Sequence, residues 1–493
     1  MADELTGLIA AAGPGSRLHP RSKKTSKVLL TVDGESLLAR NIRIMKNDIG
    51  IKTIYIITGV NHDSVKREIE EEAVSGIDIR YIRNHTPEEG LAKGVLLAEG
   101  HIESDFCLML SDEMYDNSGH DRIRDFLSQD YMAVCAVKKG APGHEIRKNY
   151  SVEIENGKLL KLVEKPDTIT NDYLGCGTFL FNTGIFNFIK NTPASIVTGR
   201  VELVDAVNLA VHEKTTVLPF FISGDYVNVN TLDDLNYANY IIRRKVFDRK
   251  KVSLIIPAWN EADSIGHVVA DFAGKVDEIV VADNMSTDKT AEIAAAKGAT
   301  VYSVHLKGYG DAIRYGMDKA VGDILVITEA DGSFKARDLE KILEYLKDAD
   351  MVIGTRTTRQ LVEQGANMSL ILRLGNVAVA KIIEILWWRH HEPRLTDVGC
   401  TYRGIWRESW ERIRGDLKAN GPAFSPEMII EPIRHYMRII EIPVSYHGRI
   451  GGESKHSGSF MTTVKTGLSM LFLIVRKKIL YLLKEDVPGA TKK

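Results

Sequence analysis

The sequence predicts an α/β protein with two Rossmann-like domains, each a mostly parallel sheet with helices on both faces, and a C-terminal amphipathic helical tail. The chain has 493 residues, too many for one ordinary core, since domains usually hold roughly 100–200 residues. Short apolar runs rich in Ile and Val alternate with helix-like stretches in both halves, which is typical of parallel βαβ units. A strongly basic stretch, 241–251, separates the two series.

The predicted strands follow the same alternation in each half. In the first half they begin at Leu5, Thr53, Ile77 and Asp105, and in the second half at Val252, Glu278, Thr300, Asp323 and Met351. We therefore expect one domain over 1–242, a basic linker over 243–251, a second domain over 252–458 and the helical tail over 459–493. Because ligands bind beyond the carboxyl ends of strands in open α/β sheets, the informative residues are those just after each strand.

Composition narrows the class of protein. The apolar fraction of 44% and the charged fraction of 26% are those of a soluble globular protein. A formal net charge of -2 gives no global attraction for nucleic acid, so we expect no nucleic-acid partner. The four cysteines are scattered without metal-type spacing, which indicates a reducing compartment, and the acidic N-terminus has no signal peptide. These features together predict a cytoplasmic protein.

The predicted tail contains a pronounced apolar segment, GLSMLFLIV over 467–475, which Arg476, Lys477 and Lys478 follow directly. The segment is shorter than the roughly 18 apolar residues that a membrane span requires. A short apolar run with embedded cations can lie in a membrane interface, and this would place the protein at the inner face of the cell membrane through peripheral contact. A helix packed on its own domain has the same pattern, so both interpretations stay open.

A glycine-rich turn, GPGSR, comes soon after Ala11, where the first predicted strand ends. Glycines at Gly13 and Gly15 let the backbone approach a polyphosphate closely, with its amides toward the oxygens. Arg17 and Lys27 add positive charge where pyrophosphate would leave. The turn indicates a nucleotide-binding site, although ordinary tight turns share its composition.

The first half, over 5–240, resembles the sugar-phosphate nucleotidyltransferases, whose opening motif GxGxRL is followed by a lysine within a Pro-Lys pair. The lysine here is Lys27. Four further segments match in the family's order: EGLAKG (89–94), LSDEMY (110–115), VEKP (163–166) and VELVDA (201–206). The resemblance implies that Gly90 lies in a base-reading segment and that Asp112 binds Mg²⁺ (or Mn²⁺). It also implies that Glu164 binds the sugar hydroxyls and Lys165 the sugar phosphate.

The first half departs from that family at three positions. The family's second metal aspartate would fall at Asn228, whose amide oxygen can still ligate magnesium but neutralises less charge. Ser151 stands where the family has a sugar-contacting glycine, and Ser26 replaces the proline before the lysine. These departures predict an unusual sugar pocket.

The implied reaction of the first half needs no general base. An ionised oxygen of a sugar-1-phosphate would attack the α-phosphorus of a nucleoside triphosphate, and pyrophosphate would leave in line. The protein then mainly positions the phosphates and neutralises their charge. Arg17, Lys27, Asp112 and Lys165 are the candidate catalytic residues.

Acidic residues follow three predicted strands of the second half. Glu261 follows the first strand, Asp283 the second, and Glu329 and Asp331 the third. Acids at alternate positions after a strand can share one cation with a diphosphate, so Glu329 and Asp331 are candidate metal ligands. Pro257, Glu261 and Asp283 are the candidate nucleotide contacts.

The second half, over 251–457, resembles family 2 glycosyltransferases of the GT-A fold, in the branch of polyprenyl- and dolichyl-phosphate sugar synthases. The family's acidic triplet is usually Asp-x-Asp and here reads Glu329-Ala330-Asp331. The match continues through GTR, RLGN, TDVGCTYR, SPEM and IPVSYHGRIGGESKHS. It implies Asp331 and Asp397 as catalytic residues and a metal at the triplet, Mg²⁺ (or Mn²⁺). It implies a sugar- and acceptor-binding set of Arg356, Glu427, Arg449, Ser454 and Lys455.

The acceptor decides what the second half needs chemically. A lipid phosphate is a competent nucleophile at neutral pH, so cations such as Arg356, Arg449 and Lys455 would suffice. A hydroxyl acceptor would need a carboxylate as base, and Asp397 and Glu427 are then the candidates. The basic C-terminal end favours a polyprenyl phosphate.

The two resemblances predict a bifunctional enzyme, a nucleotidyltransferase and glycosyltransferase with nucleoside triphosphate, sugar-1-phosphate and nucleotide sugar as substrates. In one alternative, only the glycosyltransferase is active and the first domain is a regulatory nucleotide-binding module. In another, the first domain is a cytidylyltransferase for a phosphorylated alcohol, as its LSDEMY region also suggests. A third sends the sugar to a soluble or protein hydroxyl.

Overall fold

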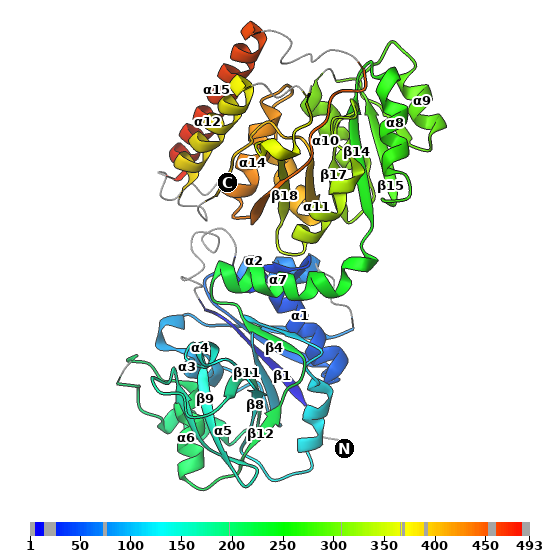
Figure 1. The fold of residues 1–493 in the computed structure, drawn as a ribbon. Coiled ribbons are helices and arrows are strands. Elements are labelled where there is room, and N and C mark those ends of the chain that lie inside the picture. The colour runs from blue at the N-terminus through cyan, green and yellow to red at the C-terminus, as the bar shows by residue number, and fades with distance from the viewer. Residues whose placement is uncertain are drawn as a thin grey trace. The chain divides into compact units, whose positions relative to one another are not determined.

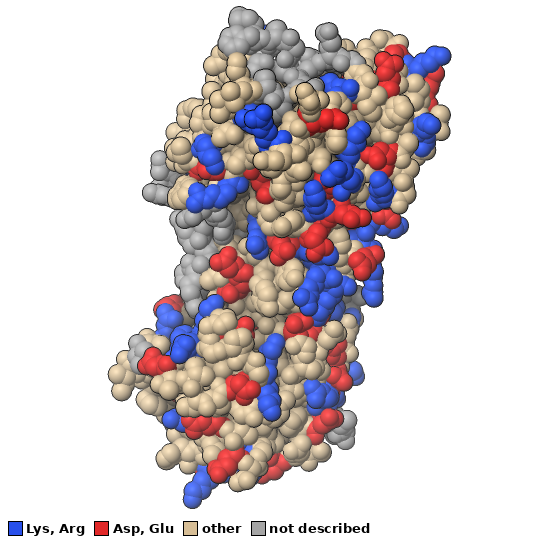
Figure 2. Space-filling view, viewed as in Figure 1, with Lys and Arg blue, Asp and Glu red and all other residues tan. Residues whose placement is uncertain are grey.

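The computed structural model describes residues 5–13, 26–71, 76–196, 198–306, 308–364, 366, 370–388, 393–451 and 460–485. The chain divides into two compact units, Met1–Ile242 and Arg243–Lys493 (Figure 1). Acidic and basic side chains are interspersed over the visible face of each unit (Figure 2). Each unit contains its own sheet and its own cores, and each is described by itself below.

The N-terminal unit is built on a mixed sheet in the order β10-β9-β11-β6-β1-β4-β5, with β8 paired to β11 and β12 to β8. The pairs β1–β4, β1–β6 and β4–β5 are parallel, whereas β11 runs antiparallel to β6 and β8. Its strands are β1 (Thr6–Ala11), β4 (Thr53–Thr58), β5 (Asp78–Arg83), β6 (Phe106–Leu110), β7 (Glu113–Asp116), β8 (Ala133–Lys139), β9 (Tyr150–Glu155), β10 (Lys158–Glu164), β11 (Tyr173–Phe181), β12 (Val217–Phe221) and β13 (Asp225–Asn228), with a small β2 (Thr31–Val32) and β3 (Glu35–Ser36) pair. Its helices are α1 (Leu37–Arg43), α2 (His62–Glu71), α3 (Leu91–Leu96), α4 (Gly143–Ile146), α5 (Ile185–Asn191), α6 (Leu203–His212) and α7 (Leu232–Val246).

Alternation along the buried strands fills a core on each face of this sheet. Ile9 and Ile54 belong to one core cluster, whereas their neighbours Leu8 and Tyr55 belong to the other. Successive side chains of a strand point to opposite faces, so a strand that is apolar at every position is covered on both sides. The continuous apolar runs of the sequence therefore mark these central strands.

The C-terminal unit has a sheet in the order β16-β15-β14-β17-β19-β18-β20. The pairs β14–β15, β15–β16, β14–β17 and β18–β20 are parallel, and β19 is antiparallel to both of its neighbours. Its strands are β14 (Val252–Ala258), β15 (Glu278–Asp283), β16 (Thr300–Ser303), β17 (Ile324–Ile327), β18 (Met351–Thr355), β19 (Arg403–Trp406) and β20 (Ile439–Pro443). Its helices are α8 (Ala262–Phe272), α9 (Thr290–Ala296), α10 (Tyr309–Lys319), α11 (Leu339–Leu346), α12 (Leu370–Trp387), α13 (Arg407–Ile413), α14 (Phe424–Arg434) and α15 (Phe460–Glu485).

The stretch predicted as a basic linker, 243–251, is folded instead. Helix α7 continues to Val246, a short 3₁₀ turn occupies Phe247–Arg249, and β14 begins at Val252. Arg243 is buried and bonds to Asp350 and Glu408, each at 2.9 Å. Basic composition here reflects ion pairing and cation–π packing, since the Arg243 guanidinium also lies 4.7 Å from the Trp406 ring centre.

The predicted tail forms the long helix α15, which runs beside α12 and also contacts α14 (Figure 1). Ile474 and Tyr481 are buried against this unit, so one face of the helix belongs to its core. The other face is exposed and apolar, and its residues form what we call the apolar stripe: Leu468, Phe472, Val475 and Ile479, each 48–71% exposed. Across the described ranges, the structure contains no helix that is both long and apolar enough to cross a membrane.

Candidate functional sites

In the N-terminal unit, the ends of β1 and β6 lie side by side. The Ser111 amide and hydroxyl donate to the carbonyl of Ala10 at 3.3 and 2.6 Å, which ties the two strand ends together. Ala11 is buried, and Gly13 lies exposed beyond it. Gly15 and Arg17, predicted as nucleotide and phosphate contacts, lie outside the described residues.

The structure connects Lys27 and Asp112 to Asn228 through Asn230, whose Nδ2 donates to Asn228 Oδ1 at 2.7 Å. The Lys27 Nζ lies 2.6 Å from Asp112 Oδ2 and donates to Asn230 Oδ1 at 3.2 Å. Strand β13 pairs with β7 so that Asn228 lies opposite Glu113, and the Val229 amide donates to the Asp112 carbonyl at 2.9 Å. A carboxylate and an amide oxygen on adjacent strand ends are ligand types that Mg²⁺ prefers, so this donor set fits a magnesium ion.

Asn149, which the sequence motifs did not indicate, connects the Lys27–Asp112–Asn228 group to the VEKP segment. Asn228 donates through Nδ2 to Asn149 Oδ1, and the Asn149 carbonyl accepts from the Lys165 amide at 2.7 Å. Lys165 has a positive φ of 44°, and its ammonium lies 3.4 Å from Glu164 Oε1. Burial raises the pKa of Glu164, with the Lys165 charge acting in the opposite direction.

Gly90 occupies a position that only glycine fits without strain. Its φ is +106°, and a Cβ there would meet the Val201 carbonyl oxygen at 3.1 Å. The predicted base-reading segment therefore lies directly against the VELVDA segment, which begins at Val201. Two of the family-like motifs are thus adjacent in the fold.

A buried polar network, absent from the sequence-based candidates, lies next to Asp112. Glu113 accepts from the hydroxyls of Tyr115 and of Tyr226, the latter at 2.7 Å, and from the Gly177 amide at 2.7 Å. Burial raises the pKa of Glu113 to about 7, and the charge of Asp112 adds to this effect. The network fixes the strand pair that carries Asp112 and Asn228.

His120 lies in the same network and is neutral. Its ring nitrogens bond to Ser118 Oγ at 2.6 Å and to Thr178 Oγ1 at 3.0 Å. Burial lowers the pKa of His120 to about 4. The two groups therefore have opposite linkage to pH. Neutral His120 contributes a stabilisation that is lost as pH falls from about 6.5 to 4. Protonated Glu113 contributes a stabilisation that is lost as pH rises from about 4.5 to 7.

In the wild type, the opposite pH dependences of His120 and Glu113 offset each other. Replacing His120 by glutamine should leave the pH dependence of stability that comes from Glu113. Relative to the wild type, the free energy of unfolding of the N-terminal unit should fall as pH rises from 4.5 to 6.5, by on the order of 1 kcal/mol per pH unit. All five tryptophans lie beyond residue 242, so amide exchange in β1 and β6 is the suitable measure. Glu113→Gln is the matched control and should give the opposite sign. Parallel pH profiles in all three proteins would contradict the assignment.

In the C-terminal unit, a cavity of about 980 Å³ lies at the carboxyl ends of β14, β15 and β17. Its polar part is lined by Pro257, Glu261, Asn284, Glu329, Asp331, Arg356 and Arg449. Asp283 lies just behind this lining: it is 5% exposed, and its Oδ2 accepts from the Ser286 amide at 3.3 Å. Of the four acids that follow predicted strands, Glu261, Glu329 and Asp331 line this one cavity. Asn284 was not among the sequence-based candidates.

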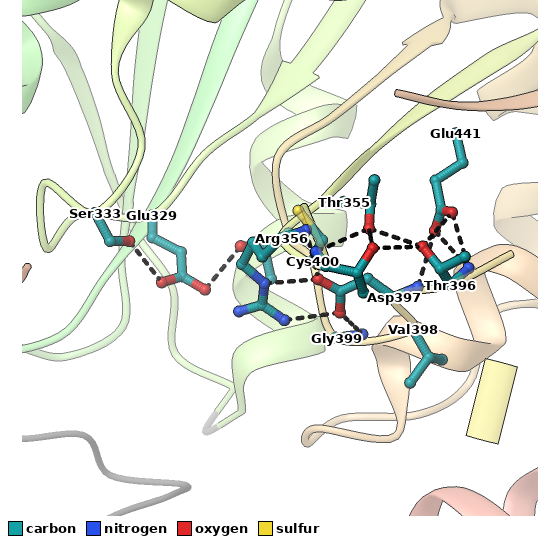
Figure 3. Close-up of polar contacts among 12 residues, drawn as sticks. Glu329, Ser333, Thr355, Arg356, Thr396, Asp397, Val398, Gly399, Cys400 and Glu441 are labelled. Atoms are coloured by element: carbon teal, nitrogen blue, oxygen red, sulfur yellow. Dashed lines mark hydrogen bonds and ion pairs between the residues drawn. The ribbon is translucent and has the colours of Figure 1, made fainter. Parts of the chain in front are cut away.

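Glu329 and Asp331 form the acidic centre of the cavity. Asp331 accepts from the Ser333 amide at 2.9 Å and pairs with Arg449 at 2.9 Å. Glu329 accepts from the hydroxyl of Thr401 at 2.7 Å. It also accepts from the hydroxyl of Ser333 at 3.4 Å (Figure 3). Burial raises the pKa of Glu329 to about 7, and the charge of Asp331 adds to this. Two buried carboxylates so close fit a divalent cation, whose charge would offset their repulsion.

Arg356 lines the cavity. Asp397 does not line it but forms a buried ion pair with the Arg356 guanidinium. Asp397 accepts from Arg356 Nε at 2.8 Å and Nη2 at 2.9 Å, and also from the Arg356 amide at 3.0 Å (Figure 3). Glu441 in turn accepts from the Asp397 amide at 2.9 Å. Burial acts to raise the pKa of Asp397, but the Arg356 charge outweighs it and the pKa lies below its ordinary value. A Cβ at Gly399 would come within 3.0 Å of Arg356 Nη2.

Neither of the two sequence-based candidates for a general base lines the cavity. Asp397 is fully buried in its ion pair with Arg356. Glu427 is fully buried on α14, where it accepts from the amides of Lys418 and Ala419 and pairs with Lys477. The structure therefore differs from the expectation that these carboxylates contact the acceptor, because local cations and amides already occupy them. Ser454 and Lys455 lie outside the described residues.

The cavity continues from its polar part into an apolar wall. Helix α12 contributes Ile371, Leu372, Val379 and Ile382, and helix α15 contributes Val464, Leu468, Met470 and Leu471. The RLGN motif lies within α12, but no sequence motif showed that α12 and α15 come together, because the two helices are far apart in the chain. The sequence feature that indicates the wall is the apolar composition of these two helical segments.

A cluster of potential metal ligands elsewhere in this unit is already saturated by cations. Asp416, Glu431 and His435 place their ligand atoms within 4.8 Å of one another. Glu431 accepts from Arg434 at 2.7 and 2.8 Å and from Lys477 at 2.6 Å. The cluster is therefore an ion-pair network.

In both units, parallel strand ends thus bring carboxylates and cations to one edge of the sheet, the edge at which open α/β sheets bind their ligands. Residues 6–245 match the nucleotidyl transferase family and residues 253–413 match glycosyl transferase family 2. The chain therefore belongs to the transferases, with an N-terminal nucleotidyltransferase domain and a C-terminal family 2 glycosyltransferase domain.

Relatives of both kinds are found. The low-salt glycan biosynthesis hexosyltransferase Agl6 of Haloferax volcanii is 31% identical over 208 residues, which are 41% of this chain and 48% of that protein. The undecaprenyl-phosphate mannosyltransferase of Micrococcus luteus is 29% identical over 226 residues, or 43% of this chain and 89% of that protein. The UTP–glucose-1-phosphate uridylyltransferase AglF of Haloferax volcanii is 24% identical over 234 residues, or 48% of this chain and 95% of that protein. The chain thus spans about half the length of Agl6.

Proposed function

We propose that this chain catalyses two consecutive reactions. The N-terminal unit joins a nucleoside triphosphate and a sugar-1-phosphate into a nucleotide sugar and releases pyrophosphate. The C-terminal unit transfers the sugar from a nucleotide sugar to a polyprenyl phosphate. The observation that carries the proposal is the cavity of the C-terminal unit, where carboxylates and arginines continue into an apolar wall. An acceptor with a charged head and an apolar chain matches that division.

In the N-terminal unit, the side chains act by neutralising and orienting phosphates. An ionised oxygen of the sugar-1-phosphate forms the new bond to the α-phosphorus, and the bond to pyrophosphate breaks. Lys27 and Lys165 supply positive charge, and Asn149 keeps the backbone at Lys165 in register with Asn228. Asp112 and Asn228 would hold Mg²⁺ (or Mn²⁺), which supplies further positive charge to the phosphates.

In the C-terminal unit, an oxygen of the acceptor phosphate forms the new bond to the anomeric carbon, and the nucleoside diphosphate leaves. Arg356 and Arg449 neutralise the phosphates, and Glu329 and Asp331 would hold Mg²⁺ (or Mn²⁺), which supplies charge at the leaving diphosphate. A phosphate monoester is already ionised at neutral pH and needs no base. The ion-paired state of Asp397 and Glu427 supports this acceptor over a hydroxyl.

The surface of α12 and α15 supports a peripheral membrane contact at the cytoplasmic face. The apolar stripe of α15 continues the apolar wall of the cavity outward, and Ile371 and Leu374 of α12 are also more than half exposed. An extended apolar surface on helices that do not span a bilayer is typical of proteins that lie in its interface. The mannosyltransferase of Micrococcus luteus, named for undecaprenyl phosphate, supports the same acceptor class.

The test uses the full chain with labelled sugar-1-phosphate, nucleoside triphosphates, Mg²⁺ and phospholipid vesicles that contain polyprenyl phosphate. The label should enter the organic phase only when both a nucleoside triphosphate and the polyprenyl phosphate are present. Accumulation of a labelled nucleotide sugar without a lipid product would overturn the acceptor assignment. The chain should also sediment with the vesicles, and Phe472→Glu should weaken this while the equally exposed control Val321→Glu should not.

A further inference from the structure

Lys477 of α15 occupies an unusual position between two buried carboxylates. Its ammonium lies 2.6 Å from Glu431 Oε1 and 2.7 Å from Glu427 Oε1, and it donates to the Asp416 carbonyl at 2.8 Å. Both glutamates are on α14, one helical turn apart, and both are 0% exposed. A lysine from the C-terminal helix therefore supplies the positive charge for two carboxylates in the interior of this unit.

The two glutamates differ in how much they depend on Lys477. Glu431 also accepts two hydrogen bonds from Arg434, at 2.7 and 2.8 Å. For Glu427, Lys477 is the cation that the described structure provides. A buried carboxylate that loses its cation is strongly destabilised, so the position of Glu427 depends on α15.

Glu427 connects this ion pair to the cavity. Its Oε2 accepts from the amides of Lys418 and Ala419, at 2.8 and 2.7 Å. The same loop continues through Asn420, whose carbonyl accepts from the Gly310 amide at 2.6 Å, to Gly421 and Pro422, which line the cavity. Arg314 of α10 also donates to the Ala419 carbonyl at 2.9 Å and to Asn420 Oδ1 at 3.1 Å. The loop therefore keeps its place in the cavity wall through hydrogen bonds to α10 and to Glu427, and the bonds to Glu427 are the ones that depend on Lys477.

We propose that Lys477 is a positioning residue for sugar transfer, which joins the docking of α15 to the shape of the acceptor part of the cavity. It does not line the cavity itself, but α15 contributes Leu468 and Leu471 to the wall. Through Glu427 the same lysine fixes the loop 418–422. The packing of α15 against its unit and the formation of the apolar wall of the cavity are therefore coupled. The link to sugar transfer rests on the proposed function, whereas the link between Lys477 and the loop does not.

The test compares Lys477→Met with Arg476→Met, which removes the same charge from the neighbouring, exposed position of α15. In Lys477→Met, amide exchange at Lys418 and Ala419 should accelerate about tenfold, because their acceptor loses its buried cation. The KM for polyprenyl phosphate should rise about tenfold, and the KM for the nucleotide sugar should change less than about twofold. Pyrophosphate release by the N-terminal unit should be unchanged, and the nearly unchanged KM for the nucleotide sugar verifies that the C-terminal unit, which carries the substitution, is folded.

A double variant, Lys477→Met with Glu427→Gln, separates positioning from general loss of structure. The glutamine is neutral and can still accept from the two amides, so exchange and acceptor KM should return most of the way to the wild type. Unchanged exchange and KM in Lys477→Met would overturn the proposal, as would a double variant as impaired as the single one. If the wild type itself transfers no sugar to polyprenyl phosphate, the proposed function fails. The exchange experiment then still decides whether Lys477 positions the loop.

Discussion

Asp331→Ala should reduce sugar transfer by about 10³-fold or more, since metal-assisted charge stabilisation is worth several kcal/mol in the transition state. Asp331 lies in the cavity beside Glu329, and the pair is the only place among the described cavity-lining residues where two carboxylates adjoin. The alanine variant should still fold, because its partner Arg449 is 24% exposed and can turn toward water. The loss should appear mainly in kcat.

The measurement is transfer from a supplied nucleotide sugar, so that the result does not depend on the N-terminal unit. Pyrophosphate release from sugar-1-phosphate and nucleoside triphosphate, measured on the same preparation, should remain at the wild-type rate. Full transfer activity in Asp331→Ala would remove the acidic pair from the mechanism. Loss of both activities would instead indicate damage to the whole chain.

Asp112→Ala should give the reciprocal result: pyrophosphate release reduced by about 10³-fold or more, and transfer from a supplied nucleotide sugar unchanged. Asp112 is the carboxylate of the Lys27–Asp112–Asn228 group, and removing it leaves an amide oxygen as the remaining ligand of the predicted pair. Lys27 would also lose its partner at 2.6 Å while it is 11% exposed, so a modest loss of stability should accompany the loss of rate.

The pyrophosphate assay, applied to the wild type and to Asp112→Ala, also decides whether the N-terminal unit is an active enzyme or a regulatory binding module. Wild-type chain that binds nucleoside triphosphate with Mg²⁺ in calorimetry but releases no pyrophosphate would identify a binding module. Measurable release that depends on Asp112 would identify a working nucleotidyltransferase, even though Asn228 stands where a second carboxylate is expected.

The parallel strands and the residues that follow them could be predicted because both are local in the sequence. Continuous apolar runs such as that of β14 identify strands covered on both faces, and Glu329 and Asp331 follow their strand directly. The antiparallel strand β19 was not predicted. Its pairing with β17 joins segments about eighty residues apart, and no short pattern encodes that pairing.

The roles of the individual carboxylates could not be predicted from the motifs. Asp397 and Glu427 have the residue type of a general base, but the fold gives each of them a cation partner: Arg356, 41 positions away, and Lys477 on another helix. Glu113 adjoins Asp112 in sequence, yet the pleat turns it into the core, where tyrosine hydroxyls surround it. Residue type is local information, whereas ionisation state and orientation depend on distant neighbours.

The ion pair between Asp397 and Arg356 has a consequence for which lipids can react. With this carboxylate held by a guanidinium and Glu427 held by Lys477, neither is available to deprotonate an alcohol. Under the proposed mechanism, the cavity therefore selects its acceptor by ionisation rather than by shape. A free polyprenol has the same chain as its phosphate and can occupy the same apolar wall, but it carries no ready nucleophile. The enzyme would thus leave the membrane's pool of neutral isoprenoid alcohols untouched and glycosylate only the phosphorylated fraction.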